Sequence, residues 1–202
     1  SCDIFFYAVG GGWEKIKGLG ISLLIKYFKK FGLGQKTGID LSGEKEGLVP
    51  TPEWKKKVKG EPWVLGDTYH VSIGQGDLLV TPLQLAVATA VVANGGNLIQ
   101  PFLVSKITDP NGKTILKINS KIRAKQIVSK EAVRIAREGM REAVVWGTAR
   151  RLADLPQPVA AKTGTAQFEN SEKAHSWFSA FGPWQDPEIL VVVMVEKGGE
   201  GY

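Results

Sequence analysis

The sequence is poor in the residues that build disulfide frameworks and metal sites. Its 202 residues include one cysteine, Cys2, and two histidines, His70 and His175. A single cysteine excludes an internal disulfide, and with no cluster of cysteine and histidine nothing indicates a zinc site. We therefore expect no metal and no cofactor, and we interpret both histidines as ordinary core or surface residues.

Long apolar runs are missing as well. The longest uninterrupted run, Ile189–Val195, has the length of a strand and is far short of the roughly 20 residues that a membrane-spanning helix needs. The chain also lacks an initiator methionine and opens on an apolar stretch, Ile4–Tyr7. Because domains seldom begin in the middle of a core, we expect a fragment of a longer protein, without that protein's membrane anchor.

Charge of one sign does not dominate. The chain has 26 basic and 20 acidic residues, a net charge of +6, and 43% apolar residues, which is ordinary for a globular chain. The basic residues are dispersed and no nucleic-acid motif is present. We therefore expect no nucleic-acid partner, although the charge leaves open a non-catalytic basic module that binds nucleic acid or glycan strands.

The local patterns predict helices first and a small sheet last. Apolar residues at three- and four-residue steps predict a helix over 13–31, and Thr81-Pro82 opens a helix that stops at Asn94. Segments 102–108 and 113–118 predict a hairpin around a Pro-Asn-Gly turn, and Ser129 caps a further helix. The run Lys55–Lys57 is interpreted as a solvated face.

The last third predicts three strands, over 159–168, 176–181 and 188–196. Their connections are short, so neighbouring strands should be antiparallel. The chain thus divides into a mainly helical part, 1–100, and a part with hairpin, helix and antiparallel strands, 101–202. This pattern predicts an α+β fold in which helices flank an antiparallel sheet.

The strongest chemical signal is Lys-Thr-Gly-Thr at 162–165, inside a predicted strand. Thr163 and Thr165 point to the same side, where two hydroxyls could hold a carboxylate, and Lys162 adds a positive charge. Gly164 in a strand interior often marks the close approach of another backbone. An edge strand of this kind can pair with an extended peptide. A plain surface strand would also account for these four residues.

Two further motifs are weaker when each stands alone. Ser1-Cys2-Asp3 precedes an apolar helical run, and by itself it is most simply a helix cap. Gly74-Gln75-Gly76, followed by Thr81–Ala86, predicts a tight turn that leads into a buried helix. It lacks the Gly-Lys-Ser/Thr ending of a phosphate loop, and we assign it no chemistry of its own.

In this order and spacing, the motifs resemble the transpeptidase domain of class B penicillin-binding proteins, and within them the elongation-type group, penicillin-binding protein 2. Lys162–Gln167 is similar to the family's third motif, and Ser1–Asp3 to its second, with Asp3 where most members have Asn. The resemblance covers nearly the whole chain and implies the penicillin-binding (β-lactamase-like) fold, truncated. Other family-like segments lie at 36–41, 66–68, 74–84 and 175–181.

The resemblance implies serine acyl transfer on a peptidoglycan stem peptide that ends in D-Ala-D-Ala, with β-lactams acylating the same serine. It implies that Ser1 relays a proton, that Asp3 bonds substrate or the catalytic lysine, and that Lys162 acts electrostatically. Thr163 and Thr165 would bind the terminal carboxylate next to Gly164, and the Thr165 N–H would serve the oxyanion hole.

The family's nucleophile motif, Ser-x-x-Lys, should precede the Ser1 element, where this chain has no residues. The literal match Ser42–Lys45 lies in a stretch rich in glycine and charge, which we interpret as a loop. We therefore expect this fragment to be inactive alone. The alternative enzyme is a class D β-lactamase-like serine hydrolase or β-lactam sensor, which is not expected to carry the 74–86 segment.

For the parent protein the resemblance implies the periplasmic side of the cell inner membrane. It also implies a partner, a glycosyltransferase of the elongation machinery.

Overall fold

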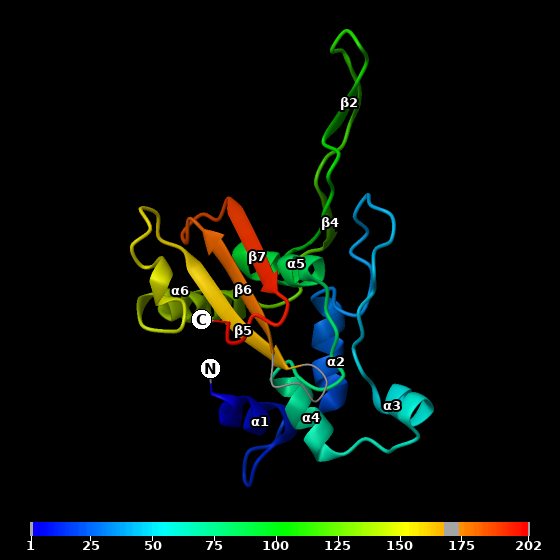
Figure 1. Ribbon diagram of the computed structural model, residues 1–202, viewed down its shortest axis with the longest axis vertical. Helices are drawn as coiled ribbons and strands as arrows, with labels where there is room; N and C mark the ends of the chain where they lie inside the picture. Colours follow the sequence, from blue (N-terminus) through cyan, green and yellow to red (C-terminus); the bar gives the residue numbers. More distant parts are fainter. Residues whose placement is uncertain (1, 168–173, 202) are drawn as a thin grey trace.

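The computed structural model describes residues 2–167 and 174–201. Figure 1 shows a body of helices around one sheet, with a long arm projecting from it. The elements are α1 Asp3–Gly11, α2 Ile21–Lys30, α3 Pro52–Lys59, α4 Leu65–Ser72, α5 Pro82–Ala93, β1 Leu98–Gln100, β2 Lys106–Thr108, β3 Thr114–Lys117, β4 Lys121–Ala124, α6 Lys130–Val145, η1 Arg150–Leu152, β5 Ala160–Gln167, β6 Ala174–Gly182 and β7 Ile189–Val195.

Helix α5 lies at the centre and begins where the sequence predicts. The Thr81 hydroxyl accepts from the Gln84 N–H, and the Gln84 side chain accepts from the Thr81 N–H, which is a capping box. The fully buried Gln84 amide also donates to the carbonyls of Gln35 and Glu46. This explains why a polar residue belongs in an apolar helix: it ties the loop after α2 to the core.

The sheet has the order β5-β6-β7, and both pairings are antiparallel, as predicted. Ala160 and Phe181 are buried in one cluster with Ala93 of α5. On the opposite face Ala161 packs with Val144 of α6. Alternate residues of β5 thus belong to two clusters, and α6 contributes to each, with Met140 in the first and Val144 in the second. The α+β fold is confirmed.

The predicted helix over 13–31 is wrong in its first half. Residues Trp13 and Ile16 pair in a tight turn, and α2 begins only after Gly20, which has a positive φ of 75°. Gly18 packs so closely on the chain that an added Cβ would lie 2.2 Å from the Gly12 nitrogen. Apolar spacing could not show this tertiary contact between two glycines.

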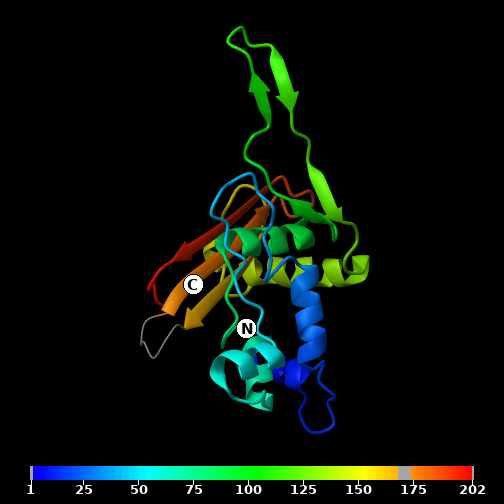
Figure 2. The same ribbon diagram turned by 90° about the vertical axis from the view of Figure 1, so that its right-hand side faces the viewer.

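The arm is a two-part hairpin, β1 with β4 and β2 with β3, as Figures 1 and 2 show. The turn at Asp109–Gly112 lies where the sequence predicts it. The base is fixed to the loop after α2: Asp40 accepts from Leu103 and Val104 N–H, and Arg123 donates to the Lys36 and Thr37 carbonyls. The family-like segment 36–41 therefore anchors the arm.

Candidate active site

Strand β5 has β6 on one side and, among the described residues, no strand on the other. Side chains reach its open edge: Lys162 Nζ donates to the Thr163 carbonyl at 2.5 Å, and Gln75 Nε2 to the Thr165 carbonyl at 3.0 Å. In an antiparallel strand the N–H and C=O of one residue point to the same side. The N–H groups of Thr163 and Thr165 therefore also face the open edge, where an extended peptide could pair.

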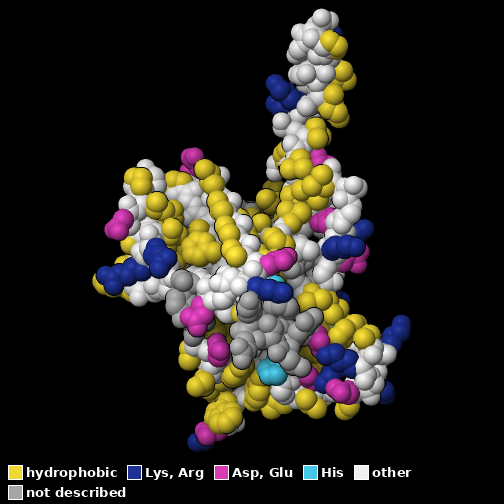
Figure 3. Space-filling view, viewed as in Figure 1, with side chains coloured by type: hydrophobic (Ala, Val, Ile, Leu, Met, Phe, Trp, Pro, Cys, Tyr) yellow, Lys and Arg dark blue, Asp and Glu magenta, His cyan; other side chains and the backbone are white. Residues whose placement is uncertain are grey.

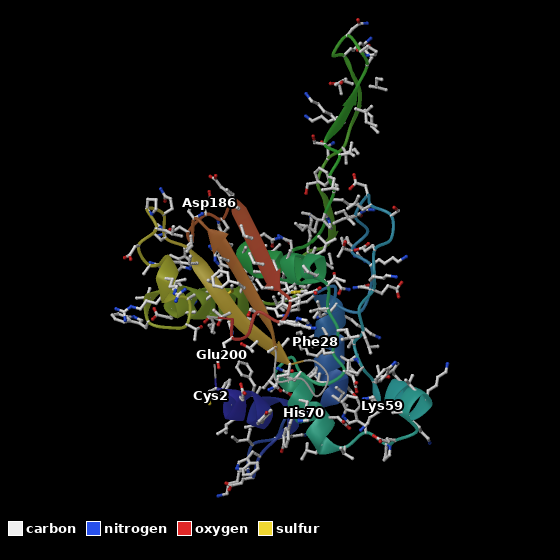
Figure 4. The ribbon with its side chains drawn as sticks, in the orientation of Figure 1. Cys2, Phe28, Lys59, His70, Asp186 and Glu200 are labelled. Carbon is white, nitrogen blue, oxygen red and sulfur yellow. The ribbon has the colours of Figure 1, made fainter. Side chains whose placement is uncertain are left out.

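Lys162 and Asp3, 159 residues apart in sequence, lie within electrostatic reach of each other. Desolvation lowers the pKa of the Lys162 ammonium, and the negative charge of Asp3 opposes that shift. Asp3 opens α1 directly after Cys2, which Figure 4 shows at the start of this helix. The structure thus brings together two of the predicted site residues. Ser1 lies outside the described residues.

The two threonines lie on the same face of β5, opposite to the face of Lys162. Thr163 is buried, with 8% of its surface exposed, and its hydroxyl lies 2.7 Å from the hydroxyl of Thr148. Thr165 is exposed, and its hydroxyl accepts from the Gly201 N–H at 3.1 Å. No sequence pattern pointed to Thr148, which follows α6 in a stretch without a motif.

Gly164 lies opposite Trp177 in the β5-β6 register. A Cβ on Gly164 would lie 3.3 Å from the Trp177 Cβ, and a Cβ on Gly201 would lie 2.1 Å from the Gly164 carbonyl oxygen. The absence of a side chain at 201 therefore lets the backbone there approach β5 closely, whereas a Cβ on Gly164 would meet only Trp177.

Comparison with known proteins identifies the family. The family described as "Penicillin binding protein transpeptidase domain" matches residues 1–202. The chain is 36% identical to the peptidoglycan D,D-transpeptidase MrdA of Acinetobacter baumannii, over 100% of this chain and 31% of that protein. It spans about a third of that relative's length.

The chain belongs to the penicillin-binding protein transpeptidase family.

Solved structures of the family share the fold. Penicillin-binding protein 2 (PBP2) of Pseudomonas aeruginosa, in complex with WCK 5153, matches with a TM-score of 0.78 and 35% identity, over 98% of this chain and 43% of that one. PBP2 of Helicobacter pylori, in complex with MreC, matches with a TM-score of 0.80 and 32% identity, over 98% of this chain and 35% of that one. The predicted resemblance to the PBP2 group is confirmed.

The literal Ser-x-x-Lys match at 42–45 falls between α2 and α3. Ser42 is exposed in a loop, as predicted, and not at the start of a helix. The function of this stretch is structural: the Glu44 carboxylate accepts from the N–H and hydroxyl of Thr37 and from the N–H of Gly38. Desolvation opposes the ionisation of Glu44, but these bonds together outweigh it and hold the pKa of Glu44 below its usual value.

The Gly-Gln-Gly motif reaches the candidate site through a contact that sequence analysis missed. Gly74 and Gly76 have φ values of 78° and 72°, so the chain turns sharply after α4. The backbone N–H of Gln75 donates to the His70 carbonyl at 2.9 Å, and Figure 4 shows His70 on α4. The turn is thereby fixed, and it directs the Gln75 side chain to β5.

Helix α4, which carries this turn, is held by an ion pair. Lys55 is 7% exposed, and its Nζ lies 2.8 Å from Asp67 Oδ2. Asp67 also accepts from the Val64 N–H. Desolvation opposes the ionisation of Asp67, but Lys55 and this N–H outweigh it and keep the pKa of Asp67 below its usual value. The expectation that Lys55 belongs to a solvated face is wrong, because the chain folds an acidic partner onto it.

The described residues contain no group of three or more acidic, histidine or cysteine side chains that could hold a metal ion. Within the same residues, no helix combines the length and the hydropathy that crossing a bilayer requires.

Proposed function

We propose that residues 1–202 are part of the transpeptidase domain of a serine-type peptidoglycan D,D-transpeptidase. The observation that carries this proposal is the open edge of β5, where two backbone N–H groups face outward beside Lys162 and Asp3. Relatives named D,D-transpeptidase support it. The segment 74–84, which joins this edge to α5, favours this function over a class D β-lactamase-like hydrolase.

In the proposed reaction the serine of an upstream Ser-x-x-Lys motif attacks the carbonyl between two D-alanines of a stem peptide. The acyl group moves to the serine, the terminal D-alanine leaves, and the amine of a second stem peptide then takes the acyl group from the serine. Ser1 passes the proton that the attacking serine loses to the leaving amine of the terminal D-alanine. The Thr165 N–H, which faces the open edge, donates to the oxyanion that forms during attack.

The remaining residues hold the substrate. The Lys162 ammonium attracts the terminal carboxylate and stabilises its negative charge, and Asp3 bonds substrate or the catalytic lysine. Each threonine hydroxyl has one proton and two lone pairs. When Thr163 accepts from Thr148, its own proton is therefore free for the carboxylate, next to the Thr165 hydroxyl. Gly164 leaves room for the substrate backbone.

The whole protein is proposed to act at the periplasmic side of the inner membrane, together with a glycosyltransferase. A structure matched by this chain is described as a peptidoglycan synthase complex that coordinates polymerization and crosslinking. β-Lactams are proposed to acylate the same serine, in keeping with the name of the family.

A fluorescent penicillin tests this function. The 202-residue chain is expected to give no covalent adduct, because it has no Ser-x-x-Lys at a helix start, whereas the longer protein that includes the upstream segment should be labelled. The measurement is in-gel fluorescence after denaturation. Labelling of the 202-residue chain would show that it contains a nucleophile, and failure to label the longer protein would refute the transpeptidase assignment.

A further inference from the structure

The Gln75 side chain donates a hydrogen bond to a backbone carbonyl at the open edge of β5. Its Nε2 donates to the Thr165 carbonyl at 3.0 Å, between two segments 90 residues apart. The bond is made by a long side chain that is only half-buried, whereas the backbone of Gln75 is fixed by its own bond to His70. The amide can therefore leave the carbonyl by side-chain rotation while the turn keeps its shape.

A substrate that pairs with β5 needs the same carbonyl. In an antiparallel arrangement the residue opposite Thr165 exchanges two hydrogen bonds with it, accepting from the Thr165 N–H and donating to the Thr165 carbonyl. If the attacked residue places its carbonyl at the Thr165 N–H, as the proposed function requires, its amide N–H reaches the carbonyl that Gln75 holds. This inference therefore rests on the proposed function.

We propose that Gln75 is a specificity-determining residue. Its side-chain amide donates to the Thr165 carbonyl in the free enzyme. Acyl donors that carry an amide N–H at that position displace it from this carbonyl. A donor with this N–H puts its own amide in place of the Gln75 amide at the Thr165 carbonyl. A donor without it leaves the Gln75 bond in place. Since exchanging one neutral hydrogen bond changes the free energy only modestly, the residue tunes the choice of donor and does not switch activity on or off.

The test compares two β-lactams on the longer, acylatable protein. A penicillin has an acylamino side chain with an N–H, and a carbapenem has a hydroxyethyl group in its place. In Gln75→Ala the penicillin no longer competes with the Gln75 amide, so its second-order acylation rate constant should rise by roughly 2- to 10-fold. The constant for the carbapenem should stay within about twofold of its wild-type value.

Gln35→Ala is the matched control. It removes another amide-to-carbonyl bond, from Gln35 Nε2 to the Lys29 carbonyl at 3.0 Å, after α2 and away from β5. It should change neither constant. An equal fall for both drugs in Gln75→Ala would show that Gln75 positions the strand, and unchanged constants would show that it has no function in acylation. Either result overturns the inference while wild-type acylation still supports the proposed function.

A second measurement does not depend on the variant folding. The side-chain NH₂ signals of Gln75 in the wild-type protein, followed by NMR, should shift to the values of a free amide after acylation by the penicillin and stay unchanged after acylation by the carbapenem. Signals that respond equally to both drugs would contradict displacement. A wild-type protein that neither drug acylates would refute the proposed function, and this inference with it.

Discussion

The two outer strands of the sheet differ in what their side chains offer. Strand β5 carries a glycine and two hydroxyls, and side-chain amide and ammonium groups reach its outward carbonyls. Strand β7 is an unbroken apolar run, and its Val191 and Val193 are 50% and 45% exposed; Figure 3 shows hydrophobic side chains along this strand. The edge that we propose to bind a ligand is polar, and side chains already occupy part of it, whereas β7 offers only apolar residues that favour strand pairing.

The largest effect on the acylation rate is expected when the positive charge of Lys162 on β5 is removed. Lys162→Ala should lower the acylation rate of the longer protein by a penicillin by about 100-fold or more, the loss typical of removing one group that stabilises developing charge. Stopped-flow acylation measures this. The exposed lysine on α3, replaced in Lys57→Ala, is the matched control and should keep the wild-type rate. A wild-type rate in Lys162→Ala would remove Lys162 from the site.

The same lysine should make the acylation rate fall at alkaline pH. Its pKa is lowered by desolvation from the ordinary 10.5, with the charge of Asp3 opposing the shift, so the ammonium is lost as pH rises through that lowered value. The acylation rate should therefore begin to fall below pH 10.5, and this limb should be absent in Lys162→Ala.

A smaller effect is expected at β7. An exposed apolar strand at a sheet edge invites pairing with a second copy, so the 202-residue chain should self-associate with rising concentration. Val193→Lys places a charge on the exposed face and should shift the chain toward monomer, as light scattering would show. Val192→Ile, on the opposite face of the strand, is the control. A wild-type chain that stays monomeric at all concentrations would contradict this view of β7.

The difference between β5 and β7 also marks what the sequence could predict. Local patterns were sufficient for the α5 cap at Thr81, for the arm turn at Asp109–Gly112 and for the three antiparallel strands. The Lys-Thr-Gly-Thr strand was found because a glycine inside a strand is unusual and the four residues resemble a family motif. Each of these features depends on neighbours within a few residues, which hydrophobic periodicity and turn preferences describe.

The features that sequence analysis missed depend on contacts between distant segments. The packing of Gly18 on Gly12 interrupts the expected helix. The pairing of Lys55 with Asp67 buries a lysine within a basic run. The Gln75 bond to Thr165 joins the Gly-Gln-Gly turn to β5. None of these has a periodic signal, because the partner residue is chosen by the fold.

The central claim is that the Thr165 N–H at the open edge of β5 receives the oxyanion. A crystal structure of the longer protein acylated by a penicillin tests it most directly. The account predicts the acyl carbonyl oxygen at about 2.7–3.1 Å from the Thr165 nitrogen, with Lys162 beside the drug's carboxylate. An acyl group bound elsewhere, with the β5 edge empty, would contradict it.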